Sequence, residues 1–200
     1  MTVRKATYRS LVSLQRDTAR CRACVEAGHP LESLPVHAPY AAQQAYLFGQ
    51  APGIVEGAEG LPWRGRAGQA LRRWLSLEEE AFYATFYCAS VTRCYPGRTA
   101  SGRGDRAPTP QEQDLCEHWR DRELELLGPG LIVTVGGLAL RRMLGFTELT
   151  PCVGERFERA GVPVVPLPHP SGASSWPHVP ENRARLERAL GLVQTELRRL

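Results

Sequence analysis

Four short apolar segments, each followed by glycine, proline or polar residues, limit the folds open to this 200-residue chain more than any other feature. They are residues 45–48, 84–91, 131–135 and 162–167. Each is apolar along nearly its whole length, which is typical of strands covered on both faces of a parallel sheet. Helical patterns alternate with them, over residues 4–19, about 69–77, 110–127, 138–144 and 180–200. We therefore predict an α/β fold in which helices cover both faces of a parallel sheet.

Three of the predicted strands end in residues suited to a ligand site. The ends read Gly49-Gln50-Ala51-Pro52-Gly53, Ser90-Val91-Thr92-Arg93-Cys94 and His169-Pro170-Ser171. In open parallel sheets, ligands bind in the crevice beyond the carboxyl ends of the strands. We therefore expect these three segments to meet at one site.

The segment from residue 49 to residue 68 holds eight glycines and prolines, too many for a regular element. Because glycine has no Cβ, such a loop lets the backbone come close to a ligand. Glu56, Trp63 and two arginines stand inside it. We predict that this segment is an irregular loop forming the active site, with Glu56 as its working carboxylate and Glu59 as the second choice.

The basic residues favour an anionic partner such as nucleic acid. Only Lys5 among the 25 basic residues is a lysine, and the planar guanidinium of arginine suits phosphate groups. A GC-rich genome, which favours arginine codons, explains the same count. No apolar run reaches the roughly 20 residues of a membrane span and no signal peptide is visible, so we expect a cytoplasmic protein.

Four of the six cysteines are placed so that they can meet. Cys21 and Cys24 form a CxxC pair after the first helix, Cys94 follows a strand, and Cys116 lies on a helix. Disulfides are not expected without an export signal, so the set indicates a metal ion or cluster. An iron–sulfur cluster and a structural zinc both accept four thiolates, and spacing does not separate them. The alternative is ordinary reduced cysteines, as we expect for Cys88 and Cys152.

Together these segments resemble the uracil-DNA glycosylase superfamily, most closely its iron–sulfur branch, family four. That branch carries Gly-Glu-x-Pro-Gly, an acidic stretch, Gly-x-Pro-Phe-x-Gly and x-Ala-Gly. With the same spacing this chain has Gly49-Gln50-Ala51-Pro52-Gly53, Glu56, Gly60-Leu61-Pro62-Trp63-Arg64-Gly65 and Arg66-Ala67-Gly68. The later motifs Lys-Cys-Arg-Pro-Pro, Arg-Ala-Pro-x-Pro before a cysteine, and His-Pro correspond to Arg93-Cys94-Tyr95-Pro96-Gly97, Arg106-Ala107-Pro108-Thr109-Pro110 before Cys116, and His169-Pro170.

The resemblance implies a three-layer αβα sandwich around a four-stranded parallel sheet, with residues 1–200 as a single domain. It implies a [4Fe-4S] cluster without a redox role, with zinc as the alternative, which ties the N-terminal helix to the domain. The ligands of that cluster would be Cys21, Cys24, Cys94 and Cys116. It also implies a monomer that removes uracil from DNA.

The chain departs from the family pattern at several positions that would face the base. Gln50 replaces the first-motif glutamate, Trp63 replaces a stacking phenylalanine, and Ser90 stands where the second motif carries a uracil-reading asparagine. The loop 97–106 is also lengthened by an insertion. These changes concern uracil specificity more than the fold.

Glycosidic cleavage builds positive charge on the sugar and negative charge on the leaving base of a flipped nucleotide. We expect Glu56 and His169 to be catalytic, the first at the sugar and the second as a donor to the base carbonyl. The residues expected to bind the base are Gln50, Ala51, Trp63 and Ser90. Without the resemblance, a solvated glutamate, a strand-capping histidine and a core tryptophan would be the ordinary interpretations.

The residues expected to contact DNA lie in two loops. They are Arg98, Arg103, Arg106, Ser171, Gly172 and Ser174. The loop ending at Trp176 would enter the DNA, with the tryptophan as a wedge, or would be a plain connector. No lysine lies in the motifs, so we predict a monofunctional glycosylase for uracil or another deaminated base. The alternatives are a DNA- or damage-binding protein that has lost catalysis and a zinc-stapled nucleic-acid protein.

Overall fold

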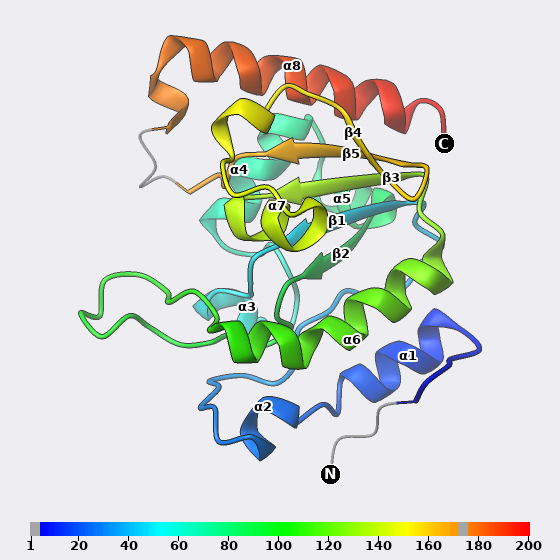
Figure 1. Cartoon of the computed structure of the whole chain (residues 1–200), viewed down its shortest axis with the longest axis vertical. Coiled ribbons are helices and arrows are strands. Elements are labelled where there is room, and N and C mark those ends of the chain that lie inside the picture. The colour runs from blue at the N-terminus through cyan, green and yellow to red at the C-terminus, as the bar shows by residue number, and fades with distance from the viewer. Residues whose placement is uncertain (1–4, 172–175) are drawn as a thin grey trace.

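The computed structural model describes residues 5–171 and 176–200, and five strands within those ranges form one sheet in the order β2-β1-β3-β5-β4 (Figure 1). The four parallel strands are β1 (Ala45–Gly49), β2 (Phe86–Ser90), β3 (Leu131–Val135) and β5 (Val162–Leu167). They confirm the predicted parallel sheet. The fifth strand, β4 (Phe157–Arg159), pairs antiparallel with β5 at the edge. Its three residues carry no apolar run, which is why the sequence did not predict it.

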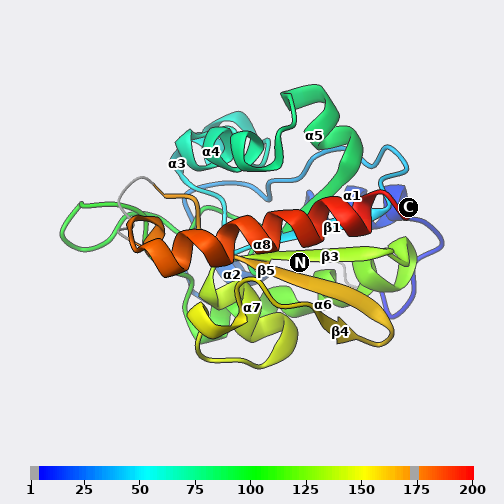
Figure 2. The ribbon, with the colours of Figure 1, turned by 90° about the horizontal axis from the view of Figure 1, so that it is seen from above.

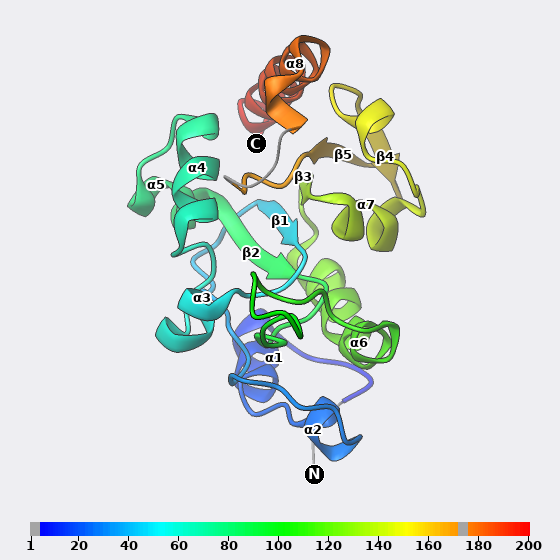
Figure 3. The same cartoon turned by 90° about the vertical axis from the view of Figure 1, so that its left-hand side faces the viewer.

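Alternate side chains of each parallel strand enter two separate cores. Ala45 and Leu47 of β1 pack toward one face of the sheet, and Tyr46 and Phe48 pack toward the other. All four side chains are fully buried, so the strand must be apolar on both faces. Figures 2 and 3 show the resulting three layers, with the sheet between two groups of helices. The predicted αβα sandwich is confirmed.

The first face is covered by α4 (Arg66–Leu75), α5 (Glu79–Thr85) and α8 (Pro180–Leu197). Helix α4 starts before the predicted residue 69 because Gly65 is its N-cap. Helix α5 was not predicted, and it occupies the first two residues of the segment expected to be a strand. Short 3₁₀ helices lie at Thr150–Cys152 and Trp176–His178.

The second face is covered by α1 (Leu11–Thr18), α6 (Pro110–Leu127) and α7 (Gly137–Leu144), with α2 (Ala23–Glu26) beside α6. Helix α6 has the predicted bounds because a capping box sets its start: Thr109 N–H donates to Glu112 at 2.7 Å and Glu112 N–H donates to Thr109 Oγ1 at 3.3 Å. Helix α1 is shorter than predicted, since Ser10 caps it.

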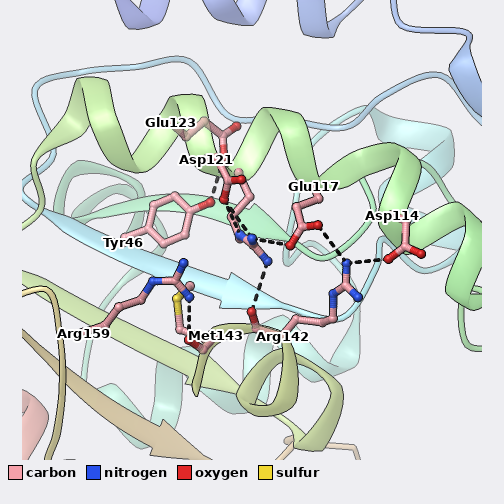
Figure 4. A network of polar contacts seen from close by, with 9 residues as sticks. Tyr46, Asp114, Glu117, Asp121, Glu123, Arg142, Met143 and Arg159 are labelled. Carbon is pink, nitrogen blue, oxygen red and sulfur yellow. Dashed lines mark hydrogen bonds and ion pairs between the residues drawn. The ribbon is translucent and has the colours of Figure 1, made fainter. Parts of the chain in front are cut away.

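Polar side chains tie α6 to α7 and to the sheet (Figure 4). The Arg120 guanidinium donates to the carbonyl of Arg142 at 3.1 Å, and Arg142 in turn donates to Asp114 at 2.9 Å. Tyr46 of β1 donates to Glu123 of α6 at 2.8 Å. Helix α6, which carries Cys116, is thereby fixed relative to β1.

The segment 49–68 is not wholly irregular, contrary to our expectation, because it contains α3 (Ile54–Glu59). The Glu56 carboxylate accepts the Gly53 N–H at 3.1 Å at the start of this helix, and Gly60, with a φ of 72°, ends it. The side-chain cap outweighs the glycine content of the segment. No helix in the described ranges is long and apolar enough to cross a membrane.

Candidate active-site pocket

A cavity of about 580 Å³ opens at the carboxyl ends of the parallel strands. Its wall includes the segment from Gly49 to Glu56, together with Trp63, Gly65, Ser90, Asp105, His169 and Ser171. The structure therefore brings the expected residues Gln50, Ala51, Glu56, Trp63, Ser90 and His169 to one cavity. Its volume lies in the range of small-molecule sites.

Glu56 holds the two sides of the cavity wall together. Its Oε2 accepts the Gly53 N–H at 3.1 Å, and its Oε1 accepts the Gly65 N–H at 2.7 Å. Glu59, the second choice, points instead to the surface, where it accepts from Arg64 at 2.7 Å. The position of Glu56 at the third residue of α3 is therefore what turns this carboxylate toward the cavity.

Trp63 is placed by its backbone and by packing against the core of the first face. Its φ of 62° lies in the left-handed region, and Arg72 donates to its carbonyl at 2.8 Å. A Cβ on Gly49 would lie 2.9 Å from Trp63 Cζ2, so the indole lies directly over the end of β1. The indole and the His169 imidazole have ring centroids 6.4 Å apart, and their planes are tilted by 34°. A flat base could be held beside both rings.

His169 follows β5 and packs against Gly136, on which a Cβ would lie 3.5 Å from His169 Cβ. Desolvation by the surrounding protein lowers the pKa of His169 from its ordinary 6.5, and the Glu56 carboxylate acts in the opposite direction. The side chain is nevertheless open to the water of the cavity. At neutral pH the imidazole is therefore neutral, with one N–H donor and one acceptor nitrogen.

Ser90, at the end of β2, uses its hydroxyl proton within the protein. Its Oγ donates to the carbonyl of Thr92 at 2.7 Å. A hydroxyl has one proton and two lone pairs, so this serine presents an acceptor to the cavity.

The loop 97–106 supplies two exposed arginines and a third, Arg106, which lines the cavity. Arg98 and Arg103 are exposed, whereas Arg106 forms a two-pronged ion pair with Glu112 at 2.6 and 2.8 Å. Arg106 thus stabilises the start of α6, and its expected contact with DNA stays a prediction.

Ser171 lies on the cavity wall, and Gly172 and Ser174 lie outside the described residues. Trp176, considered as a wedge, packs against the α8 side of the core and donates to Thr150 at 2.8 Å. Its indole is therefore partly engaged by the protein itself.

Asp105 is a cavity residue that the sequence did not reveal. It lies at the end of the basic loop, where its backbone forms an isolated antiparallel β-bridge with that of Arg98. Tyr95 donates a hydrogen bond to its Oδ1 at 2.8 Å. Burial and this hydrogen bond raise the pKa of Tyr95 to about 12. The only sequence signal was an acidic residue inside an otherwise basic loop.

The four predicted ligand cysteines are neighbours. Burial raises the pKa of Cys94, and the nearby thiols of Cys116, Cys21 and Cys24 raise it further. Trp119 of α6 donates its indole N–H to Cys21 Sγ at 3.3 Å. Cys88 lies apart, inside the core of the opposite face.

Within the described parts of the chain, no group of three or more His, Cys, Asp or Glu side chains is arranged to hold a metal ion. The thiols are thus close enough to interact but do not converge on one point. As a donor set, four neighbouring thiols fit the chemistry of an iron–sulfur cluster or of zinc.

Three known proteins that are similar to this chain are named type-4 uracil-DNA glycosylases. Residues 38–191 match the family model described as the uracil DNA glycosylase superfamily. The type-4 uracil-DNA glycosylase of Thermotoga maritima is 32% identical over 128 residues, which cover 62% of this chain and 63% of that protein. The type-4 enzyme of Archaeoglobus fulgidus is 29% identical over 86% of this chain and 87% of its own length. The type-4 enzyme of Sulfurisphaera tokodaii is 25% identical over 85% and 78%.

Proposed function

The chain belongs to the uracil-DNA glycosylase superfamily, and from this premise we propose that it is a DNA repair glycosylase. It hydrolyses the N-glycosidic bond of uracil, or of another deaminated base, in DNA and leaves an abasic site. The observation that carries this proposal is the single cavity at the strand ends, where Glu56, Trp63, Ser90 and His169 meet.

The target base must leave the helix to reach such a cavity. Trp63 offers a flat face on which the flipped base stacks, beside His169. Glu56 places negative charge near the sugar, where positive charge builds as the glycosidic bond breaks. The N–H of neutral His169 and the backbone amides of Gln50 and Ala51 are the donors for the departing base oxygen.

Ser90 supports a deaminated substrate. Because its proton goes to Thr92, the hydroxyl accepts a hydrogen bond from the base edge. Uracil and hypoxanthine carry a ring N–H at that edge, whereas cytosine and adenine carry an acceptor nitrogen there. Ser90 therefore pairs with the ring N–H of uracil or hypoxanthine and not with the ring nitrogen of cytosine or adenine, without telling one deaminated base from another.

For the cofactor, we propose that Cys21, Cys24, Cys94 and Cys116 hold a [4Fe-4S] cluster, with zinc as the alternative. When bound, the cluster would connect the segment that holds Cys21 and Cys24 to Cys94 and to Cys116 of α6. It would take no part in base removal. Residues 1–200 would then act as one domain and as a monomer, in the cytoplasm with the chromosome.

The metal content of two cysteine variants tests this cofactor. Protein purified without oxygen should contain iron and acid-labile sulfide, and Cys94→Ala should lose most of both. Cys152→Ala is the matched control, because Cys152 lies in a 3₁₀ helix away from the other thiols, and it should retain them. Zinc in place of iron, or unchanged iron in Cys94→Ala, would contradict the proposed cluster.

DNA would lie across the cavity mouth, near exposed Arg98 and Arg103 and near Ser171. We extend the DNA contact to Gly172 and Ser174, and we assign Arg106 to holding the loop through Glu112.

The decisive experiment measures free uracil released from an oligonucleotide with one uracil. We expect wild type to release it, and Glu56→Gln and His169→Ala to be slower by a factor of about 100 to 10,000, the usual range for general acid–base groups. Glu59→Gln, which changes a surface carboxylate three residues away on α3, should retain the wild-type rate. Full activity in both cavity variants would refute these roles.

A second candidate, a DNA- or damaged-base-binding protein without catalysis, is favoured by Gln50 and Ser90, which replace charged and amide groups of the family pattern. Tight binding of uracil-containing DNA with no release of base after long incubation would support it over the glycosylase.

A further inference from the structure

A second carboxylate, Asp105, shares the cavity wall with Glu56. Loop 97–106 runs from the end of the β2 strand region to α6 and projects beside α3 (Figures 1 and 3). The loop is closed by the backbone β-bridge between Arg98 and Asp105. The Arg106 N–H also donates to the Gly97 carbonyl at 2.9 Å. Asp105 therefore stands at the closed base of the loop, next to the cavity.

Gly53 shows how near the two carboxylates come. A Cβ on Gly53 would lie 2.8 Å from Glu56 Oε2 and 2.9 Å from Asp105 Oδ2. The two oxygens thus converge on the same point of the cavity wall from different parts of the chain. Any side chain at position 53 would separate them.

One buried tyrosine positions both acidic residues. The Tyr95 hydroxyl donates to Asp105 Oδ1 at 2.8 Å, and a Cβ on Gly57 would lie 2.9 Å from Tyr95 Cβ, so α3 packs directly on this side chain. Tyr95 is 2% exposed, so it is a rigid support. Asp105 is exposed but tethered, and Glu56 is carried by the helix above the same ring.

The two carboxylates differ in what their oxygens already do. Each oxygen of Glu56 accepts a backbone N–H, from Gly53 and from Gly65. Asp105 has one oxygen bound to Tyr95, and across residues 5–171 and 176–200 no hydrogen-bond donor reaches its Oδ2. Glu56 is therefore largely engaged in holding the loop, and Asp105 has an oxygen free for a water molecule.

We propose that Asp105 is a second catalytic carboxylate, an inference that rests on the proposed glycosylase function. As the glycosidic bond breaks, its electron pair leaves with the base. The water oxygen bonds to the sugar carbon, and one water proton passes to Asp105 Oδ2. The departing base later gains a proton, and Asp105 returns its own to solvent. Glu56 and Asp105 together stabilise the positive charge on the sugar.

The test compares four proteins in single-turnover release of uracil from an oligonucleotide. Asp105→Asn keeps an oxygen for the Tyr95 hydroxyl but removes the charge, and we expect a rate about 100-fold below wild type. Asp114→Asn, which removes an exposed carboxylate on α6, should match wild type. The melting temperature and the affinity for DNA carrying an uncleavable uridine analogue should stay unchanged in Asp105→Asn.

Asp105→Ala provides the second readout, because the deletion opens space for a small acid. Added formate should raise its rate in proportion to formate concentration and should not affect Asp114→Asn. Wild-type-like rates in Asp105→Asn, or a loss in Asp105→Ala that formate does not restore, would overturn the proposal while the glycosylase function stands. No release of base by wild type would overturn both.

Discussion

Gly68 and Trp63 depend on each other. A Cβ on Gly68 would lie 1.8 Å from the carbonyl oxygen of Trp63 and 2.3 Å from its carbonyl carbon. That carbonyl cannot move freely, because Trp63 already holds a left-handed φ of 62° and accepts a hydrogen bond from Arg72. The position of the Trp63 ring, on which a flipped base would stack, therefore depends on Gly68, a helical glycine that does not line the cavity.

We predict that Gly68→Ala destabilises the protein and displaces Trp63. Overpacking costs roughly 1–3 kcal/mol, and the contact here is with backbone, so about 3 kcal/mol or more is expected. Gly191→Ala on α8 is the matched control, since nothing lies within 4 Å of its added Cβ. It should gain about 0.5–1 kcal/mol from helix propensity. Urea denaturation measures both, and equal stabilities of the two variants would contradict the packing argument.

At the scale of elements, a buried ion pair joins α6 to the sheet beside the cysteines. Arg93 and Glu123 pair with side chains 3% exposed, and Tyr46 and Tyr87 donate to the same carboxylate at 2.8 and 3.2 Å. Arg93 directly precedes Cys94, and Glu123 lies two turns beyond Cys116 on α6. The pair therefore holds two of the proposed cluster ligands in one place before any metal binds.

Glu123→Gln should be strongly destabilising. The amide keeps one accepting oxygen, for only one of the two tyrosines, and it leaves the Arg93 charge buried without a counter-charge. Breaking a buried pair costs about 3–5 kcal/mol. Glu187→Gln removes an exposed partner of Arg183, whose side chains are 75% and 66% exposed, and should cost less than about 1 kcal/mol. The free energy of unfolding of the apoprotein checks this; equal losses in both variants would refute it.

At the scale of the whole molecule, stability should fall as the solution is acidified below neutrality. Burial lowers the pKa of His37 from 6.5, and the positive charge of Arg93 lowers it further. As the pH falls, the unfolded chain therefore binds a proton at His37 before the folded chain does. The contribution of neutral His37 to the free energy of unfolding is complete above pH 6.5 and is lost as the pH falls through the pKa of the folded state.

His37→Gln should flatten this dependence. Unfolding free energies measured from pH 8 down to pH 5 should decline less steeply in the variant than in wild type. The carboxyl groups of Asp17 and Glu112, whose pKa values are held below 3.8 and 4.5 by their partners, act only at lower pH and do not disturb the comparison. Parallel curves for variant and wild type would show that His37 is not the group responsible.

Much of the architecture is encoded in local signals. Strands β3 and β5 and helix α6 have the predicted bounds, because an apolar run or the Thr109–Glu112 capping box depends only on neighbouring residues. Helices α3 and α5 were not predicted: in our prediction the glycine content of the segment 49–68 outweighed the local Gly53–Glu56 cap, and α5 is held by the packing of its buried Phe82 in the core. The family motifs also placed Glu56, Trp63 and His169 among the candidates.

The sequence by itself thus determined the parallel sheet, the strand ends that carry the site and the candidate residues there. Only the tertiary structure decided which carboxylates face the cavity: the Gly65 N–H turns Glu56 inward, and Tyr95 brings Asp105 from a separate loop. It also decided that the Ser90 hydroxyl presents a hydrogen-bond acceptor to the cavity, and that Arg106 forms an ion pair with Glu112. The physical reason is range, since caps and apolar periods act within a few residues, whereas the cavity is built from segments as far apart as Gly49, Ser90 and His169.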